Sequence, residues 1–216
     1  AGTYTISVTD QNNCISNPAQ ITQKLTQPLA INFTALEQDI SCNGAEDGSI
    51  DITVTGGTVP YTYAWIGPNS FSETTQDINA LVPGAYTITV TDDNECALVE
   101  NYIITEPDIL DLAGDLSDYN GFEVSENGLS DGSIDITVTG GTTPHSYSWT
   151  SLNGTIPVGQ ETQEDLTGLN AGTYTVQITD TNGCTITKTW EITEPFELLI
   201  NESPASHVDV LCFGDN

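Results

Sequence analysis

The twelve residues DGSIDITVTGGT occur at positions 47–58 and again, letter for letter, at 131–142. A catalytic motif normally occurs once for each active site, whereas a structural building block recurs in every unit that contains it. The duplication therefore predicts a chain built from repeated domains.

The second half of the repeat is also written several times. It reads AGTYTISVTDQNNC at 1–14, PGAYTITVTDDNEC at 83–96 and AGTYTVQITDTNGC at 171–184. Each copy leads into a segment that ends in LTQP at 25–28 or in ITEP at 104–107 and 192–195. The chain is thus expected to be a slice of a longer protein, with the end of one repeat at 1–28, full repeats at 29–107 and 108–195, and the start of another at 196–216. A period of about 80–90 residues fits small, independently cored domains in tandem.

Within a repeat, apolar residues recur at every second position. Ile50, Ile52 and Val54 alternate with polar residues, and Tyr86, Ile88 and Val90 do the same. Alternation with period two is typical of half-buried strands. No window of helical length shows i, i+3, i+4 spacing, and the Gly-Gly pairs at 56–57 and 140–141 are turn chemistry. The sequence predicts an all-β fold.

The strand count and two aromatic motifs favour an immunoglobulin-like Greek-key β-sandwich. About seven short strands fit into each repeat, with Trp65 or Trp149 on the third. The segments LVPGAY and LNAGTY place Tyr86 and Tyr174 in the pattern of a tyrosine corner, so these four aromatics are the predicted core. In the first full repeat the predicted strands are A near 29–36, B at 49–55, C at 61–65, F at 86–91 and G at 97–105.

Five motifs together resemble a known family. They are C-N-G-x-x-D-G-S-I (42–50), G-G-T-x-P-Y (56–61), Y-x-W (63–65), L-x-x-G-x-Y-T-I-T-V-T-D-x-N-x-C (81–96) and I-T-E-P (104–107). The chain resembles SprB-type repeats, relatives of PKD domains in very large cell-surface adhesins of gliding bacteria of the Bacteroidetes. The resemblance covers essentially the whole chain. It implies secretion to the bacterial cell surface, a long array of sandwich domains, and a role in surface attachment or gliding.

The charge of the chain narrows the range of partners. Two lysines, no arginine and 31 acidic residues give a net charge of −29. Such a charge repels nucleic-acid phosphates and anionic lipid heads, so neither nucleic-acid binding nor membrane-surface binding is expected. No run of apolar residues approaches the ~20 needed to span a bilayer, so membrane insertion is not expected either. Expected partners are neighbouring repeats of the same chain and, as an alternative, surface polysaccharide or other cell-surface proteins.

Five cysteines, at 14, 42, 96, 184 and 212, allow three pairing schemes in a secreted protein. Pairing within a repeat gives Cys42–Cys96 and leaves Cys184 alone, because Glu126 occupies the position of its partner. Pairing at the constant spacing of 28 residues gives Cys14–Cys42 and Cys184–Cys212, and leaves Cys96 alone.

The third scheme follows from sandwich topology. The A–B and F–G turns lie at opposite ends of such a domain, about 20 Å apart, which is too far for a disulfide. The A–B turn of one domain faces the F–G turn of the next, which favours Cys42–Cys184 across the repeat junction. Reduced, half-buried cysteines remain the simpler alternative.

Acidic turns raise the question of Ca²⁺. Glu46, Asp47 and Asp180 would come close together at the junction and could offer oxygen ligands. Ordinary turn chemistry explains the same residues more simply, because Asp caps its own backbone and Gly takes a positive φ. We expect no cofactor, with Ca²⁺ as the alternative.

No catalytic constellation is found. His145 and His207 belong to no H-E-x-x-H motif, and G-x-S-x-G and Walker sequences are absent. The expected function is a structural stalk of a large surface adhesin or filament, with the repeats forming an extended rod. Two alternatives are repeats that themselves bind polysaccharide or a surface, and accessory repeats of a secreted hydrolase.

Overall fold

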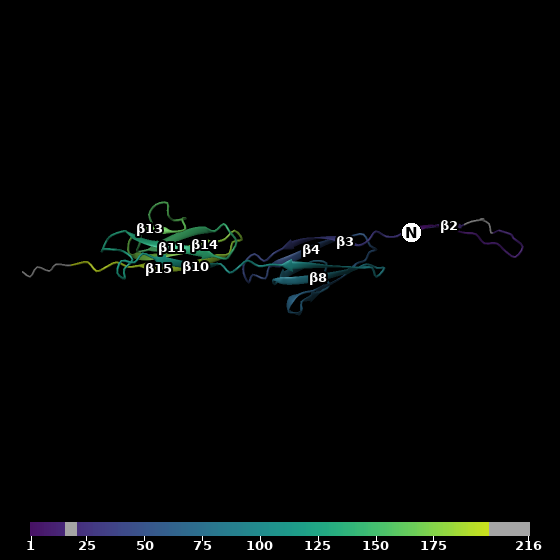
Figure 1. Cartoon of the computed structure of the whole chain (residues 1–216), viewed down its shortest axis with the longest axis horizontal. Helices are drawn as coiled ribbons and strands as arrows, with labels where there is room; N and C mark the ends of the chain where they lie inside the picture. Colours follow the sequence, from purple (N-terminus) through teal and green to yellow (C-terminus); the bar gives the residue numbers. More distant parts are fainter. Residues whose placement is uncertain (16–20, 199–216) are drawn as a thin grey trace, which may run out of the picture. The chain divides into compact units, whose positions relative to one another are not determined.

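The structure, a computed structural model, describes residues 1–15 and 21–198. The chain divides into two compact units, Ala1–Asp108 and Ile109–Asn216, each with its own hydrophobic core (Figure 1). In the described part of the chain, no helix is long and apolar enough to cross a membrane.

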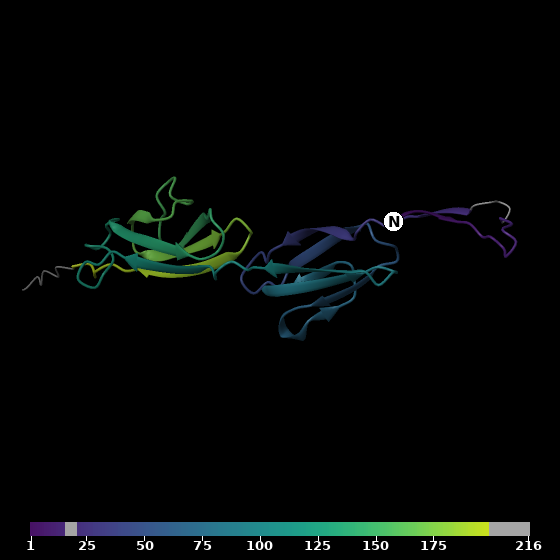
Figure 2. The same ribbon diagram turned by 45° about the vertical axis from the view of Figure 1, so that its right-hand side comes forward.

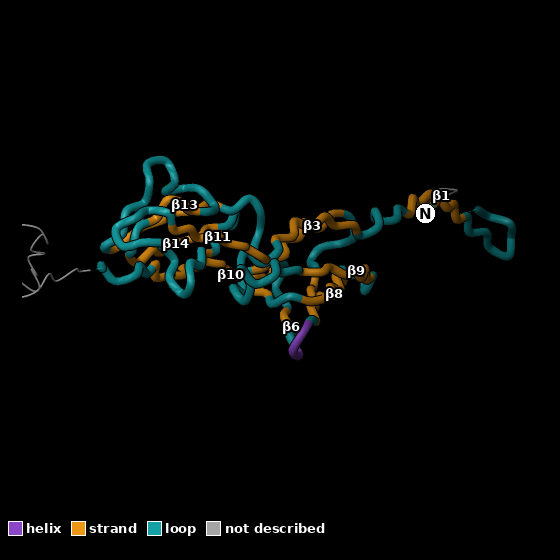
Figure 3. Tube along the Cα trace, turned by 60° about the vertical axis from the view of Figure 1, so that its left-hand side comes forward, coloured by secondary structure: helices purple, strands orange, loops and turns teal. Residues whose placement is uncertain are grey.

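The first unit contains a complete sandwich of two antiparallel sheets (Figure 2). One sheet has the order β3 (Asn32–Gln38), β4 (Gly48–Thr55), β7 (Ile78–Leu81). The other has the order β6 (Ser72–Glu73), β5 (Thr62–Ile66), β8 (Gly84–Thr91), β9 (Ala97–Ile104). A single 3-10 turn, η1 (Pro68–Ser70), precedes β6 (Figure 3). With β3, β4 and β7 as strands A, B and E, and β5, β8 and β9 as C, F and G, the strand order is that of an immunoglobulin-like Greek key.

The second unit has the same A–B–E and C–F–G sheets, and its described strands include no counterpart of β6. One sheet has the order β10 (Asp111–Leu116), β11 (Gly132–Thr139), β13 (Leu166–Leu169). The other has the order β12 (Ser146–Leu152), β14 (Gly172–Thr179), β15 (Thr185–Ile192). The prediction of an all-β, immunoglobulin-like fold is confirmed.

The alternating apolar and polar residues of the strands lie on the buried and the solvent-facing side of the sheets, respectively. Ile50 and Ile52 on β4 are fully buried, and the intervening Asp51 is exposed. All four predicted core aromatics are buried: Trp65, Trp149, Tyr86 and Tyr174. At about 25 cal/mol for each Å² of apolar surface removed from water, side chains of this size dominate the stability of so small a core.

Both tyrosine corners are formed. The Tyr86 hydroxyl donates to the Val82 carbonyl oxygen at 2.9 Å, and the Tyr174 hydroxyl donates to the Asn170 carbonyl oxygen at 2.8 Å. Burial raises the pKa of both phenols, which therefore remain donors at neutral pH. The prediction of tyrosine corners from the L-x-x-G-x-Y spacing is confirmed.

The repeated Gly-Gly pair is required by the backbone. Gly56 has a φ of 72°, and a Cβ atom there would lie 2.0 Å from the carbonyl oxygen of Ala30. Gly57 has a φ of 60° and donates its amide to the Leu29 carbonyl oxygen at 2.8 Å. This bond attaches the segment that enters the repeat, and regular pairing of strand A starts only at Asn32, three residues later than predicted.

The segment 1–28 forms a two-stranded sheet of β1 (Gly2–Ile6) and β2 (Ile21–Leu25). It contains the sequence that forms the F and G strands of a full repeat, without the other strands. Tyr4, the counterpart of Tyr86, is 54% exposed, whereas Tyr86 is 0% exposed. The apolar face of this hairpin is therefore not covered within the described residues of the first unit.

Candidate functional site

The A–B turn of the first unit, residues 39–47, is bonded to the segment by which the chain leaves the repeat. The Asn43 side-chain amide donates to the Pro107 carbonyl oxygen at 3.1 Å, and the Gly44 amide donates to the Glu106 carboxylate at 2.9 Å. The second unit has the same two bonds, from Asn127 to Pro195 at 3.0 Å and from Gly128 to Glu194 at 2.6 Å. The glutamate of the ITEP motif thus fixes the turn.

Sequence reasoning missed this role of Glu106 and Glu194. The signal was present, because an Asn-Gly pair and a Glu-Pro pair occur in both full repeats at corresponding positions. The two pairs are 62–68 residues apart in the chain, so only the folded topology brings them together.

A serine and an aspartate close the same turn. The Ser41 amide and hydroxyl donate to the two carboxylate oxygens of Asp47, at 2.9 and 2.6 Å. Ser125 and Asp131 repeat this arrangement in the second unit. The hydrogen bonds from the serine side chain and amide hold the pKa of Asp47 and that of Asp131 below the ordinary value.

The F–G loop, residues 92–96, is organised by one buried aspartate. Asp92 Oδ1 accepts the amides of Asn94 and Cys96 at 3.0 and 2.9 Å, and its Oδ2 accepts the Thr58 amide at 2.9 Å. Burial raises the pKa of Asp92, but these backbone donors outweigh it and the net pKa lies below the ordinary value. The carboxylate therefore stays ionised near neutral pH and positions Cys96.

The second unit has the same loop around Asp180. Its Oδ1 accepts the amides of Asn182 and Cys184 at 2.9 and 2.8 Å, and its Oδ2 accepts the Thr142 amide at 2.8 Å. The balance between burial and backbone donors again lowers the pKa of Asp180. Cys96 and Cys184 thus both end a loop that is held by an aspartate carboxylate.

Within one repeat, the A–B turn and the F–G loop lie at opposite ends. Gly48, where the turn ends, pairs with Leu81 beside the start of β8, whereas Asp92 follows the last residue of β8. Eight strand residues at ~3.3 Å each separate the two ends by roughly 25 Å. Cys42 and Cys96 are therefore too far apart to bond.

The state of the cysteines agrees with this geometry. Cys42 and Cys184 are each disulfide-bonded, whereas Cys14 and Cys96 are free and exposed. Neither the Cys42–Cys96 bridge nor the Cys14–Cys42 bridge is formed. Cys212 lies outside the described residues, so the Cys184–Cys212 alternative is not described.

The three Ca²⁺ candidates lie in ordinary turns. Both carboxylate oxygens of Asp47 and of Asp180 accept protein donors, and Glu46 occupies a turn position with a φ of 53°. Among the described residues, no group of three or more His, Cys, Asp or Glu side chains could hold a metal. The observed hydrogen bonds are those of the turn interpretation, and the absence of a cofactor, with Ca²⁺ as the alternative, stays a prediction.

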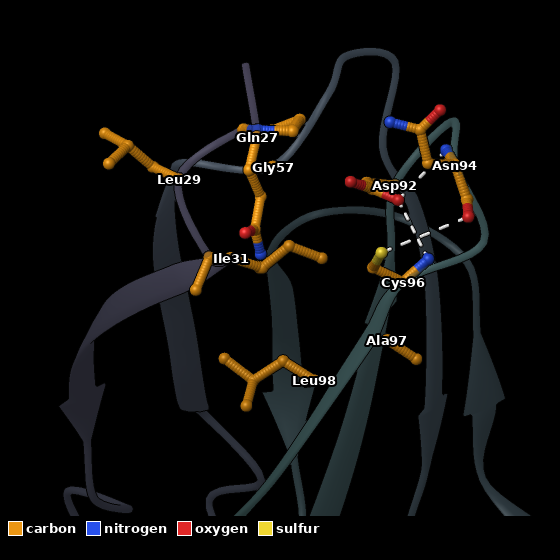
Figure 4. A pocket seen from close by; sticks show the side chains of 11 residues that line it. Gln27, Leu29, Ile31, Gly57, Asp92, Asn94, Cys96, Ala97 and Leu98 are labelled. Carbon is orange, nitrogen blue, oxygen red and sulfur yellow. Dashed lines mark hydrogen bonds between the residues drawn. The ribbon is translucent and has the colours of Figure 1, made fainter. Parts of the chain in front are cut away.

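A pocket of about 390 Å³ opens at the end of the first full repeat where the chain enters (Figure 4). Gln27, Pro28 and Leu29 line it from the entering segment, and Asn94, Cys96 and Leu98 line it from the F–G loop and β9. Its walls combine aliphatic side chains with an ionised Asp92 and a free thiol.

The family comparison matches the same part of both repeats. The sequence model of the SprB repeat matches residues 37–70 and 124–154, which run from the end of strand A through strand C. Both matched segments are similar to SprB repeats. These repeats are a non-catalytic domain type associated with cell-surface proteins, and they occur as parts of larger chains. No curated protein sequence matches the chain.

Three solved structures are distant likenesses of the chain. A C-terminal fragment of intimin, in complex with the intimin-binding domain of its translocated receptor, is 15% identical with a TM-score of 0.39, and the match covers 78% of this chain and 64% of that one. A Dscam structure is 11% identical with a TM-score of 0.32, over 78% and 47% of the two chains. The amphioxus IgVJ-C2 molecule is 15% identical with a TM-score of 0.30, over 78% and 98%. The chain thus spans less than two thirds of the first two structures, and the fold assignment rests on the strand order described above.

Proposed function

We propose that this chain is a stalk segment of a large, secreted, non-catalytic adhesin or filament that acts in surface attachment or gliding. The observation that carries the proposal is the fixed exit of each repeat. The Asn43 amide and the Gly44 amide hold Pro107 and Glu106, and Asn127 and Gly128 hold their counterparts. A chain that leaves each domain along a fixed path, and enters the next strand within a few residues, limits bending between domains.

We also propose that the Cys42 and Cys184 sulfur atoms bond to each other. The Cys42 turn is attached to Pro107 through Asn43. In the second unit, a Cβ atom on Gly141 would lie 3.0 Å from Leu110 and 3.1 Å from the carboxylate of Asp180. That carboxylate in turn holds the Cys184 amide.

Chain length connects these two sets of contacts. Only two residues stand between Pro107 and Leu110, and three residue steps span at most ~11 Å. A connection this short supports the proposed bond. A covalent clamp of this kind would stiffen the stalk at the junction.

Peptide mapping without reductant tests the clamp. Because the chain has only two lysines, digestion at acidic residues is the practical choice. We expect one linked peptide pair containing Cys42 and Cys184, and its loss in Cys42→Ser with a newly alkylatable Cys184. A Cys42–Cys96 pair would contradict the proposal.

Small-angle scattering and glycan binding test the stalk. An elongated particle that binds no polysaccharide supports it, and the Cys42→Ser variant should be more flexible at the same mass. A compact particle would refute the stalk. Selective binding of a polysaccharide by the chain would instead favour repeats that act as binding modules.

A further inference from the structure

Two segments line the pocket at the end of the first full repeat. The corresponding segments elsewhere in the chain each have a bonded partner. One wall is Gln27–Pro28, at the end of the LTQP segment. The other is the F–G loop with the free thiol of Cys96 (Figure 4). The partners of the counterparts indicate what the pocket itself binds.

The counterpart of Gln27–Pro28 binds an A–B turn. Glu106 and Pro107 occupy the same place in the ITEP segment, and they accept the Gly44 amide and the Asn43 side-chain amide at 2.9 and 3.1 Å. Gln27 retains a side-chain oxygen in place of the Glu106 carboxylate, and Pro28 retains the carbonyl group. Both acceptors needed to hold an Asn-Gly turn are therefore present at 27–28.

The counterpart of Cys96 is a bonded cysteine. Cys184 follows an Asp-x-Asn turn with the same amide-to-carboxylate bonds as Cys96, and Cys184 is disulfide-bonded. Cys96 is exposed, lines the pocket and forms no disulfide. This cysteine is thus presented in the same way and lacks only a partner thiol.

The hairpin 1–28 indicates where the partner comes from. In the full repeats, the A–B turn is held by the Glu-Pro pair of its own repeat. The turn that fits Gln27–Pro28 is therefore that of the repeat whose last two strands are β1 and β2. The remaining strands of that repeat would also cover Tyr4 and Ile6, which are 54% and 60% exposed, whereas their counterparts Tyr86 and Ile88 are fully buried.

We propose that the pocket beside Cys96 is the docking site for a Cys-Asn-Gly turn of the repeat that β1 and β2 complete. The glycine amide of that turn donates to the Gln27 side-chain oxygen, and its asparagine amide donates to the Pro28 carbonyl oxygen. Its cysteine forms a disulfide with Cys96. The two thiols lose two protons and pass two electrons to a disulfide oxidant such as oxidised glutathione. This inference rests on the junction clamp proposed above and extends it to a second junction.

An extended chain gives the first test. A second copy of residues 29–82 placed ahead of Ala1 supplies the missing strands and a second Cys-Asn-Gly turn. After oxidation with a glutathione buffer, we expect Cys96 to resist alkylation and to map to the added cysteine. The matched control carries Cys42→Ser in the added copy alone and should leave Cys96 open to alkylation. Cys14 should be alkylated in both chains.

Hydrogen exchange shows whether the added repeat folds. Protection of the β1 and β2 amides reports a completed sandwich, and an alkylatable Cys96 in such a chain would overturn the proposal. The same digest tests the junction clamp separately, through a linked peptide that contains Cys42 and Cys184 of the original copy. Its presence with a free Cys96 would therefore refute this inference and leave the clamp standing.

A second test needs no new domain. A peptide of residues 38–48, activated at its cysteine as a mixed disulfide, is offered to the native chain. Cys14 is the control, because its loop has the same bonds to Asp10 but belongs to the hairpin and not to a full repeat. Relative to a small activated disulfide without the turn sequence, we expect the peptide to favour Cys96 over Cys14 several-fold. Equal normalised rates at the two thiols would contradict a docking site.

Discussion

The two full repeats have an identical strand B, and two of the differences between them are informative, one in the core and one in the A–B turn. In the core, Ala35 pairs with Ile52, and at the corresponding position Gly114 pairs with Ile136. On strand G, Tyr102 faces Tyr86 and Trp190 faces Tyr174 in the corresponding register. The smaller residue on strand A thus accompanies the larger ring on strand G.

The close approach in the second unit explains this exchange. A Cβ atom on Gly114 would lie 2.7 Å from Cζ2 of Trp190, and the Trp190 ring lies 5.7 Å from that of Trp149. Interiors are packed densely enough that a gain of volume at one position requires a loss beside it. The core difference is therefore compensated.

The turn difference has no compensation. Cys42 is replaced by Glu126, yet Asn43 and Asn127 donate to equivalent carbonyl groups, those of Pro107 and Pro195, at 3.1 and 3.0 Å. The turn forms with either residue, because the side chains that hold it belong to the neighbouring positions and position 42 or 126 contributes its backbone carbonyl group. The comparison teaches that the residue at position 42 is not needed for the fold of its own repeat and is available for a bond outside it.

The largest expected effect concerns the core difference. Gly114→Ala should destabilise the second unit by about 1–3 kcal/mol, because its methyl group overlaps Trp190. Adding Trp190→Tyr should recover much of that loss, since the pair then resembles Ala35 and Tyr102. Hydrogen exchange resolved by unit measures both effects. An unaffected second unit in the single variant would contradict the compensation.

The tyrosine corners should differ by a smaller amount. Tyr86→Phe removes one hydrogen bond, at a cost of about 1 kcal/mol. Tyr174→Phe should cost more, because the Tyr174 hydroxyl also accepts the Thr155 amide at 3.2 Å. Denaturant unfolding followed for each unit checks the order, and a larger loss in the first unit would be inconsistent with these contacts.

The turn difference should hardly affect stability. Glu126→Cys should change the free energy of unfolding of the second unit by less than about 0.5 kcal/mol, because no hydrogen bond of the turn uses that side chain. The reverse change, Cys42→Glu, should leave the reduced first unit equally stable. Thermal unfolding under reducing conditions provides the measurement. A large loss in either variant would make the cysteine a part of the fold.

Lowering the pH should destabilise the two units to a similar degree. The pKa values of Asp47, Asp92, Asp131 and Asp180 are all lowered in the folded state. Each carboxylate therefore stabilises the fold fully above its ordinary pKa of 3.8, and this contribution is lost as the pH falls through the lower folded value. Circular dichroism and unit-resolved exchange between pH 5 and pH 2 should show parallel losses. Unfolding of one unit well before the other would show that the loops are not equivalent.

Local features of the fold could be predicted from the sequence, whereas contacts between distant residues could not. The period of two located Ile50 and Ile52 in the core, and the L-x-x-G-x-Y spacing located Tyr86 at its corner, because both signals act within a few residues. The bond from Gly44 to Glu106 joins residues 62 positions apart. Nothing in the sequence distinguishes Glu106 from the other acidic residues, 31 in all, because its partner is defined only by how the sheets fold. The pocket beside Cys96 could not be predicted for the same reason, because its lining residues are far apart in the sequence.

Single-molecule pulling from the two ends of the chain tests the Cys42–Cys184 clamp most directly. With that bond formed, the covalent load path crosses from residue 42 to residue 184, and residues 43–183 bear no tension. Reductant should therefore release roughly 140 residues at ~3.4 Å each, an added contour length of about 480 Å. The Cys42→Ser variant should show the longer contour length without reductant. Equal contour lengths for the oxidised and reduced wild-type chains would contradict the clamp.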